Sequence, residues 1–206
     1  MGGKSGGGGS GIKNRGRGDG TASKGDIANV EDLKNIKDAK LYNEMKSAIS
    51  RFYKEMGLKQ KNVKLADMQD NMLGVHVTSN GKSAGVFINK KYFKNGTVKS
   101  VVDMEKKDYK SGFSTKTNKP VAHTITHELA HSVWNNHMTG AKQVAAGKEV
   151  QKVYKQWRKD KTKKDYGSYS KTNINEFWAE TITKGIHGKA DKYTKALKAI
   201  AKKYKL

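Results

Sequence analysis

The stretch His127-Glu128-Leu129-Ala130-His131 decides how this chain is interpreted. On a helix, residues four apart lie one turn apart on the same face, so both imidazoles can reach one metal ion. Glu128 lies beside them, where its carboxylate can contact a metal-bound water and accept a proton from it. The structural alternative is two partly buried histidines next to a surface glutamate. The position of this stretch on a predicted helix, after a predicted sheet, favours the metal site.

Apolar periodicity predicts the helices around this motif. The motif helix is expected from Pro120 to about Asn136, because proline is tolerated in the first turn and apolar residues recur at helical spacing. Asp38 to Met56 shows the same periodicity and ends at Gly57, which suits a C-cap. Three further helices are expected after Gly140, from Ile174 to about Lys184 and from Asp191 to Tyr204, with a solvated loop at Lys159 to Lys164.

Short runs of alternating residues predict a small, mostly antiparallel sheet between the first helix and the motif helix. Asn80-Gly81 separates the runs Gly74 to Thr78 and Ala84 to Asn89, and this dipeptide favours a hairpin because both residues tolerate positive φ. We expect the strand Val86 to Asn89 to form the sheet edge, where an extended substrate could pair with it. The order of helix, small sheet and helices predicts an α+β fold.

The chain divides into two parts of different composition. Residues 1–26 hold 11 of the 22 glycines and very few apolar residues, so we expect a disordered Gly-rich tail. Residues 27–206 are expected to form one domain. The tail contributes five basic and two acidic side chains, so +20 of the net charge of +23 belongs to the folded part.

Composition excludes several classes of protein. The chain has no cysteine, which rules out disulfides, thiolate zinc sites, iron–sulfur clusters and cysteine nucleophiles. No apolar run approaches the ~20 residues of a membrane span, so no membrane partner is expected. The N-terminus lacks the apolar core of a secretory signal. We therefore expect a cytoplasmic or virion-associated protein, or one exported by another route.

Two histidines leave a zinc ion short of a protein ligand, and His137 is the first candidate for the third. Its spacing from His127 and His131 is that of the metzincins. That class needs a glycine at the eighth position of the motif for a sharp turn, and a later methionine turn. Trp134 occupies the eighth position here, and no methionine follows Met138. His137 is therefore the weaker candidate.

Glu176 is the second candidate for the third ligand. A carboxylate from a later helix with another acid one turn on is the gluzincin arrangement, in which Glu176 binds the metal and Glu180 orients a ligand imidazole. The alternative is a capping box, with Asn173 as the cap and the Glu176 side chain reaching back to the backbone. A capping box explains Asn173 but leaves Glu180 unexplained, so Glu176 is favoured as the ligand. His123, one turn before His127, is expected to support the site or the helix packing.

The later acidic motif also resembles a known family. Ser168-Tyr169-Ser170-Lys171-Thr172-Asn173 followed by Glu176-Phe177-Trp178-Ala179-Glu180 is similar to the C-terminal catalytic motif of the anthrax lethal factor family. That family includes secreted Pro-Pro endopeptidases, and similar zincin domains occur in phage and toxin-associated proteins. Its members have a tyrosine seven residues before the zinc-binding glutamate, and Tyr169 and Glu176 keep this spacing. The resemblance covers about residues 86–182 and is specific only at the two motifs.

The resemblance implies a zincin-like fold and one Zn²⁺ per chain. It implies that His127, His131 and Glu176 bind the zinc, that Glu128 is the general base, and that Tyr169 donates a hydrogen bond to the developing oxyanion. The expected function is a zinc endopeptidase acting on a protein or peptide. An acidic substrate is expected if the positive charge surrounds the cleft.

Two other functions remain open at this level. The excess positive charge, with lysines at 159, 161, 163 and 164, is also compatible with non-specific nucleic-acid binding, as in the SprT-like proteases that act on DNA. The lysines are scattered over several predicted helices, which weakens this alternative. The third possibility is a phage or toxin structural module without activity, and the intact Glu128 argues against it.

Overall fold

The computed structural model describes residues 27–70, 72–79, 82–137 and 140–206. The tail expected at residues 1–26 lies outside this described part. The elements are, in chain order, β1 (Ala28–Asp32), η2 (Leu33–Asn35), α1 (Ala39–Met56), β2 (Val63–Asp67), β3 (Gly74–Ser79), β4 (Lys82–Asn89), α2 (Lys90–Phe93), α3 (Val98–Lys110), α4 (Pro120–His137), α5 (Gly140–Lys159), η3 (Ser168–Lys171), α6 (Ile174–His187) and α7 (Lys192–Tyr204). The fold is α+β, as predicted.

Helix α1 shows how local signals set an element's bounds. The Asp38 side chain caps the helix by accepting a hydrogen bond from the backbone N–H of Leu41 at 2.7 Å. Gly57 ends the helix with a φ of 65°, a left-handed conformation that glycine adopts without strain. The face between these caps is buried through Leu41, Met45 and Phe52 among others. The predicted helix from Asp38 to Met56 is thereby confirmed.

The sheet is mixed, with strand order β1-β2-β4-β3. Strands β3 and β4 form the predicted antiparallel pair, with Ser79 opposite Lys82. Strand β2 runs parallel to β4 and antiparallel to β1. The expectation that Val86 to Asn89 forms a sheet edge is wrong, because β4 lies between β2 and β3. The continuous apolar run Val86-Phe87-Ile88 is typical of such an interior strand, covered on both faces. In the described sheet the edge strands are β1 and β3.

Helix α4, which carries the His-Glu-x-x-His motif, is the central helix of the molecule. Every residue from Val121 to Trp134 is buried. Helix α4 packs against the sheet through β3 and β4, against α1 on one side, and against α6 on another. Because α4 is enclosed in this way, its polar side chains must find partners inside the protein.

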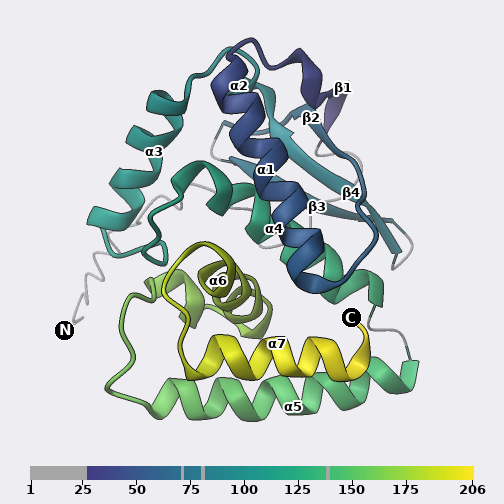
Figure 1. Cartoon of the computed structure of the whole chain (residues 1–206), viewed down its shortest axis with the longest axis vertical. Coiled ribbons are helices and arrows are strands. Elements are labelled where there is room, and N and C mark those ends of the chain that lie inside the picture. The colour runs from purple at the N-terminus through teal and green to yellow at the C-terminus, as the bar shows by residue number, and fades with distance from the viewer. Residues whose placement is uncertain (1–26, 71, 80–81, 138–139) are drawn as a thin grey trace, which may run out of the picture.

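Helices α5, α6 and α7 form a helical layer away from the sheet. Figure 1 shows α5 and α7 side by side at the end of the molecule opposite α2, with α6 packed next to α7. These helices have the predicted positions, and a loop joins α5 to η3 as expected. No helix within the described ranges is long and apolar enough to cross a membrane.

Strand β1 and helix α3 have no counterpart in the sequence predictions. The side chains of β1 are mostly exposed, so the strand lacks the alternation that identifies a half-buried strand. It is held by pairing with β2 and by ion pairs of Glu31 with Lys90 at 2.7 Å and Lys94 at 2.8 Å. Helix α3 buries only Val101 and Glu105, which is too narrow a stripe to stand out in its lysine-rich sequence.

Candidate metal centre

Helix α4 carries the histidine motif and α6 carries the acidic motif. The crossing of these two helices brings the motifs together. The indole Nε1 of Trp178 donates a hydrogen bond to the backbone carbonyl of Ala130 at 3.0 Å. The Trp178 ring also packs against Trp134, with ring centroids 5.3 Å apart. Trp178 thereby fastens α6 to α4, and the carboxylates of Glu176 and Glu180 on α6 lie against the histidines of α4.

Three donor atoms from His127, His131 and Glu176 converge at one point. The Nε2 atoms of the two histidines lie 3.0 Å apart. One carboxylate oxygen of Glu176 lies 3.1 Å from His127 Nε2 and 3.3 Å from His131 Nε2. Bonds of about 2.0–2.1 Å at tetrahedral angles would separate neighbouring ligand atoms by about 3.3 Å. The three donors therefore have the spacing that a small tetrahedral ion requires, and this buried group can hold a metal ion.

The site is buried and its charges depend on one another. Burial alone lowers the pKa of His127, but the carboxylates of Glu176 and Glu180 outweigh it and raise that pKa to about 10. Burial raises the pKa of Glu176, and the imidazoles of His127 and His131 outweigh it and lower that pKa to about 2. The ionised carboxylate of Glu176, enclosed among imidazoles, needs positive charge beside it, which a proton on His127 or a metal ion can supply.

Glu180 contacts the opposite side of the His127 ring. Its Oε1 lies 2.9 Å from His127 Nδ1 and 3.4 Å from His123 Nε2, while its Oε2 accepts a hydrogen bond from the backbone N–H of Thr115 at 3.0 Å. The hydroxyl of Tyr109 lies 3.1 Å from His123 Nδ1. A partner at Nδ1 fixes the orientation of the imidazole and directs Nε2 toward Glu176. Donor atoms of His123, His127 and Glu180 also lie within 4.8 Å of one another, so these residues form a second group that could hold a metal ion and that shares His127 with the first.

Glu128 lies at the edge strand of the sheet. Its side chain is fully buried. A Cβ added at Gly74 of β3 would lie 2.9 Å from Ile88 Cδ1 and 3.1 Å from Glu128 Cγ. A larger residue at position 74 would therefore require the Ile88 side chain to shift and would press on the Glu128 side chain.

Tyr169 packs against the motif from the segment before α6. Its ring centroid lies 5.8 Å from that of His127, with the rings inclined by 25°. The backbone N–H groups of Ser168 and Tyr169 donate to the carbonyls of Gly112 and Phe113 at 2.8 and 3.1 Å. These bonds tie η3 to the segment after α3.

Residues 112–115, to which η3 is bound, were missed by sequence reasoning. They bond to η3 on one side, and Thr115 bonds to Glu180 on the other. They form no motif, because they act mainly through backbone groups. In the segment that leads into η3, Gly167 is the residue that reflects this contact. Its lack of a side chain is required because a Cβ there would lie 2.1 Å from the Phe113 carbonyl oxygen.

The structure separates the two interpretations of Asn173 and Glu176. Asn173 caps α6, because its side-chain oxygen accepts from the backbone N–H groups of Asn175 and Glu176, both at 2.9 Å. The Glu176 side chain faces the two histidines instead of reaching back to the cap, so the capping-box alternative is right for Asn173 and wrong for Glu176. His137 is the last residue of α4, and its side chain lies outside the described part.

No protein-family model, curated protein or solved structure matches this chain.

Proposed function

We propose that this chain is a zinc-dependent endopeptidase with a zincin-like fold of the gluzincin type, related to the anthrax lethal factor family. The observation that carries the proposal is the convergence of His127, His131 and Glu176 donor atoms within 4.8 Å of one another, with Glu128 next to them on α4. The spacing between Tyr169 and Glu176 and the ring contact of Tyr169 with His127 add support.

The donor set favours zinc over the hard cations. Two imidazole nitrogens and one carboxylate oxygen are a common set of protein ligands in catalytic zinc sites, whereas Ca²⁺ and Mg²⁺ prefer oxygen ligands alone. One ion per chain would be bound by His127, His131 and Glu176. When bound, zinc polarises a peptide carbonyl and lowers the pKa of water at its open position toward about 7.

Three side chains around the proposed ion have separate roles in the reaction. Glu128 accepts a proton from the water whose oxygen attacks the carbonyl carbon, and passes it to the amide nitrogen as the carbon–nitrogen bond breaks. Tyr169 donates a hydrogen bond from its hydroxyl to the carbonyl oxygen as negative charge develops there. Glu180 holds the His127 ring in the orientation that presents Nε2.

The edge strand β3 is the proposed pairing site for a substrate. Strand β3 flanks β4 at one edge of the described sheet, and its Gly74 packs against Glu128. An extended peptide that adds to β3 would bring its backbone alongside the general base. A net charge of +23 favours an acidic peptide over a basic one.

A zinc analysis combined with a peptide-library digest tests this function. The purified chain is expected to contain one zinc per molecule. Glu128→Gln is expected to retain the zinc and to lose about 10²- to 10⁴-fold in turnover, because the glutamine cannot accept the proton. A chain that binds no zinc, with its histidines protonated instead, would support the inactive structural module. Full peptidase activity of Glu128→Gln would disprove the proposed mechanism.

A further inference from the structure

Positive charge is concentrated in the C-terminal third of the chain. Residues 140–206 contain 18 basic and 6 acidic side chains, and the acids Glu176 and Glu180 are buried in the metal centre. Residues 27–139 are longer but contain 19 basic and 11 acidic side chains. Residues 140–206 thus carry a net charge of +12 and residues 27–139, although longer, carry +8, so the C-terminal part has the higher net charge per residue.

Helix α5 presents a straight row of lysines to solvent. Intervals of four, three and four residues separate these exposed lysines, which puts them on one face: Lys148, Lys152, Lys155 and Lys159. The opposite face packs into the core through Val150 and Trp157. The row extends for about 16 Å at the helical rise of about 1.5 Å per residue. Within the described ranges, no carboxylate forms an ion pair with any of these four lysines.

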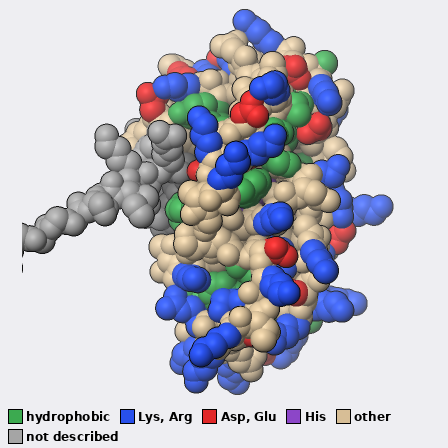
Figure 2. Space-filling view, turned by 90° about the vertical axis from the view of Figure 1, so that its left-hand side faces the viewer, with side chains coloured by type: hydrophobic (Ala, Val, Ile, Leu, Met, Phe, Trp, Pro, Cys, Tyr) green, Lys and Arg blue, Asp and Glu red, His purple; other side chains and the backbone are tan. Residues whose placement is uncertain are grey.

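Helix α7 adds a second group of lysines beside the first. Lys195 and Lys202 are exposed on α7, which packs against α5. Figure 2 shows many Lys and Arg side chains and few Asp or Glu side chains at the lower end of one face, on the level of α5 and α7 in Figure 1. The two helices together form one basic surface, which we call the α5–α7 face.

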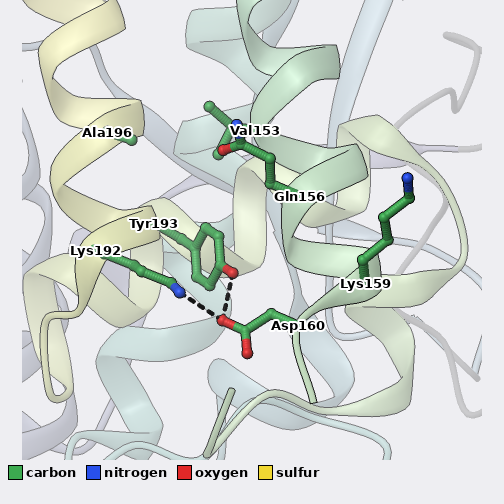
Figure 3. Close-up of a pocket in the computed structure, with 7 residues that line it drawn as sticks. All are labelled: Val153, Gln156, Lys159, Asp160, Lys192, Tyr193 and Ala196. Carbon is green, nitrogen blue, oxygen red and sulfur yellow. Dashed lines mark hydrogen bonds and ion pairs between the residues drawn. The ribbon is translucent and has the colours of Figure 1, made fainter. Parts of the chain in front are cut away.

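A hollow of about 510 Å³ lies between α5 and α7 at one end of this face. Val153 and Ala196 contribute apolar lining, and lysines contribute on both sides. Asp160, its one acidic lining residue, is paired with Lys192 at 2.7 Å and accepts a hydrogen bond from the Tyr193 hydroxyl, as Figure 3 shows. Lys159 extends away from this pair in the same view. The charge of Asp160 is therefore neutralised by Lys192, and the charges of the lysine row on α5 remain available to a binding partner.

We propose that the α5–α7 face binds the phosphate backbone of nucleic acid without regard to base sequence. A straight row of point charges about 16 Å long fits a polyanion that presents about one charge per 1.7 Å of duplex axis. Lysine ammonium groups contact phosphates and carry no base-specific hydrogen-bonding pattern. An acidic polypeptide has lower and less regular charge density, so nucleic acid is the better fit. This binding is independent of the proposed peptidase activity, because the metal centre lies between α4 and α6.

The test measures binding of the full chain to a fluorescent DNA duplex of about 30 base pairs by anisotropy, at several salt concentrations from about 50 to 200 mM. Four phosphate contacts predict a slope of about −3.6 for log K against log salt, which is a loss of about 100-fold in affinity over this range. Two duplexes of unrelated sequence are expected to bind equally. Absence of binding at about 50 mM salt, or a strong preference for one sequence, would overturn the proposal.

A quadruple variant tests the location of the binding surface. Replacing Lys148, Lys152, Lys155 and Lys159 by Gln is expected to reduce the magnitude of the salt slope by about 3 or more, and the double variant Lys152→Gln, Lys155→Gln by about half as much. The matched control replaces exposed lysines outside this face, at positions 40, 59, 61 and 64, by Gln and is expected to keep a slope within about one of the original. Equal losses in both quadruple variants would overturn the assignment to α5.

Two further measurements distinguish nucleic-acid binding by the α5–α7 face from binding of an acidic protein and from binding at the metal centre. Polyglutamate at equal charge concentration is expected to displace the duplex less well than unlabelled duplex does, and equal displacement would indicate an acidic-protein surface instead. Glu128→Gln is expected to bind DNA as tightly as the original chain, which would support a binding surface separate from the metal centre. Loss of DNA binding in that variant would overturn this separation.

Discussion

The candidate metal centre and the α5–α7 face differ in how their charges are compensated. At the centre, Glu176, His127 and His131 are almost completely buried, and one carboxylate oxygen of Glu176 lies within 3.3 Å of the Nε2 atoms of both histidines. On the α5–α7 face the charges are exposed, and solvent compensates those that have no carboxylate partner. Buried charges are costly when one partner is removed, whereas exposed charges contribute little to stability. Substitutions in the two regions should therefore differ both in size and in what they change.

The largest effect is expected from the third ligand. Glu176→Ala removes one of three converging donors, so zinc affinity is expected to fall by more than about 100-fold, beyond what an indirect partner contributes. His137→Ala is the matched control and is expected to keep zinc affinity nearly unchanged. Titration against a fluorescent zinc chelator measures both. If His137→Ala releases the zinc and Glu176→Ala retains it, the gluzincin assignment fails.

A smaller effect is expected when the residue behind the ligand is changed. Glu180→Gln weakens the contact with His127 Nδ1, so zinc affinity is expected to fall about 10- to 100-fold. Glu105 is a matched control, because it is a buried glutamate of α3 that accepts a hydrogen bond from Thr124 of α4. Glu105→Gln is expected to lower stability without changing zinc affinity. Equal zinc affinity in Glu180→Gln and the original chain would show that Glu180 has only a structural role.

The segment that supports Tyr169 should respond to a single added methyl group. Gly167→Ala forces a Cβ into the Phe113 carbonyl, so the free energy of unfolding is expected to fall by about 1–3 kcal/mol, measured by urea denaturation. Gly147→Ala on α5 is the control, since a Cβ there meets no atom within 4 Å, and it is expected to raise helix stability slightly. An unchanged stability of Gly167→Ala would show that the contact between η3 and residues 112–115 is loose.

The smallest effect is expected on the α5–α7 face. The quadruple Lys→Gln variant of α5 is expected to change the free energy of unfolding by no more than about 0.5 kcal/mol, because its lysines are exposed and form no ion pairs with described residues. Thermal unfolding of this variant beside Glu180→Gln compares the two regions directly. A large loss of stability in the lysine variant would show that the row packs on the fold.

The sequence predicted the elements that depend on local signals. Pro120 near the start of α4, the Asp38 and Gly57 caps of α1 and the apolar spacing of α6 and α7 all act within a few residues, so their helices are confirmed to within a few positions. Strand β4 shows what local signals could not predict. The turn residues identify β3 as one of its partners, but neither periodicity nor turn residues identify the parallel pairing with β2 that places β4 inside the sheet.

The candidate site was likewise predictable from local signals only in part. The four-residue spacings of His127 with His131 and of Glu176 with Glu180 determine that each pair shares a helix face, because helical geometry is the same in every protein. That the two faces meet, with the Glu176 carboxylate 3.1 Å from His127, depends on how α6 as a whole packs against α4, and the hydrogen bond from Trp178 to Ala130 is one contact of that packing. Their roles as zinc ligands and indirect support stay predictions.

The sequence by itself determined which chemical groups are present, which helices carry them and which side chains share a face, since these depend on short-range geometry. Only the tertiary structure decided that Tyr109, His123 and Glu180 form one chain of contacts behind His127, and that residues 112–115 support η3. The physical reason is that such contacts join residues distant in sequence. They depend on how whole elements fill the core, and short-range sequence patterns do not encode that arrangement.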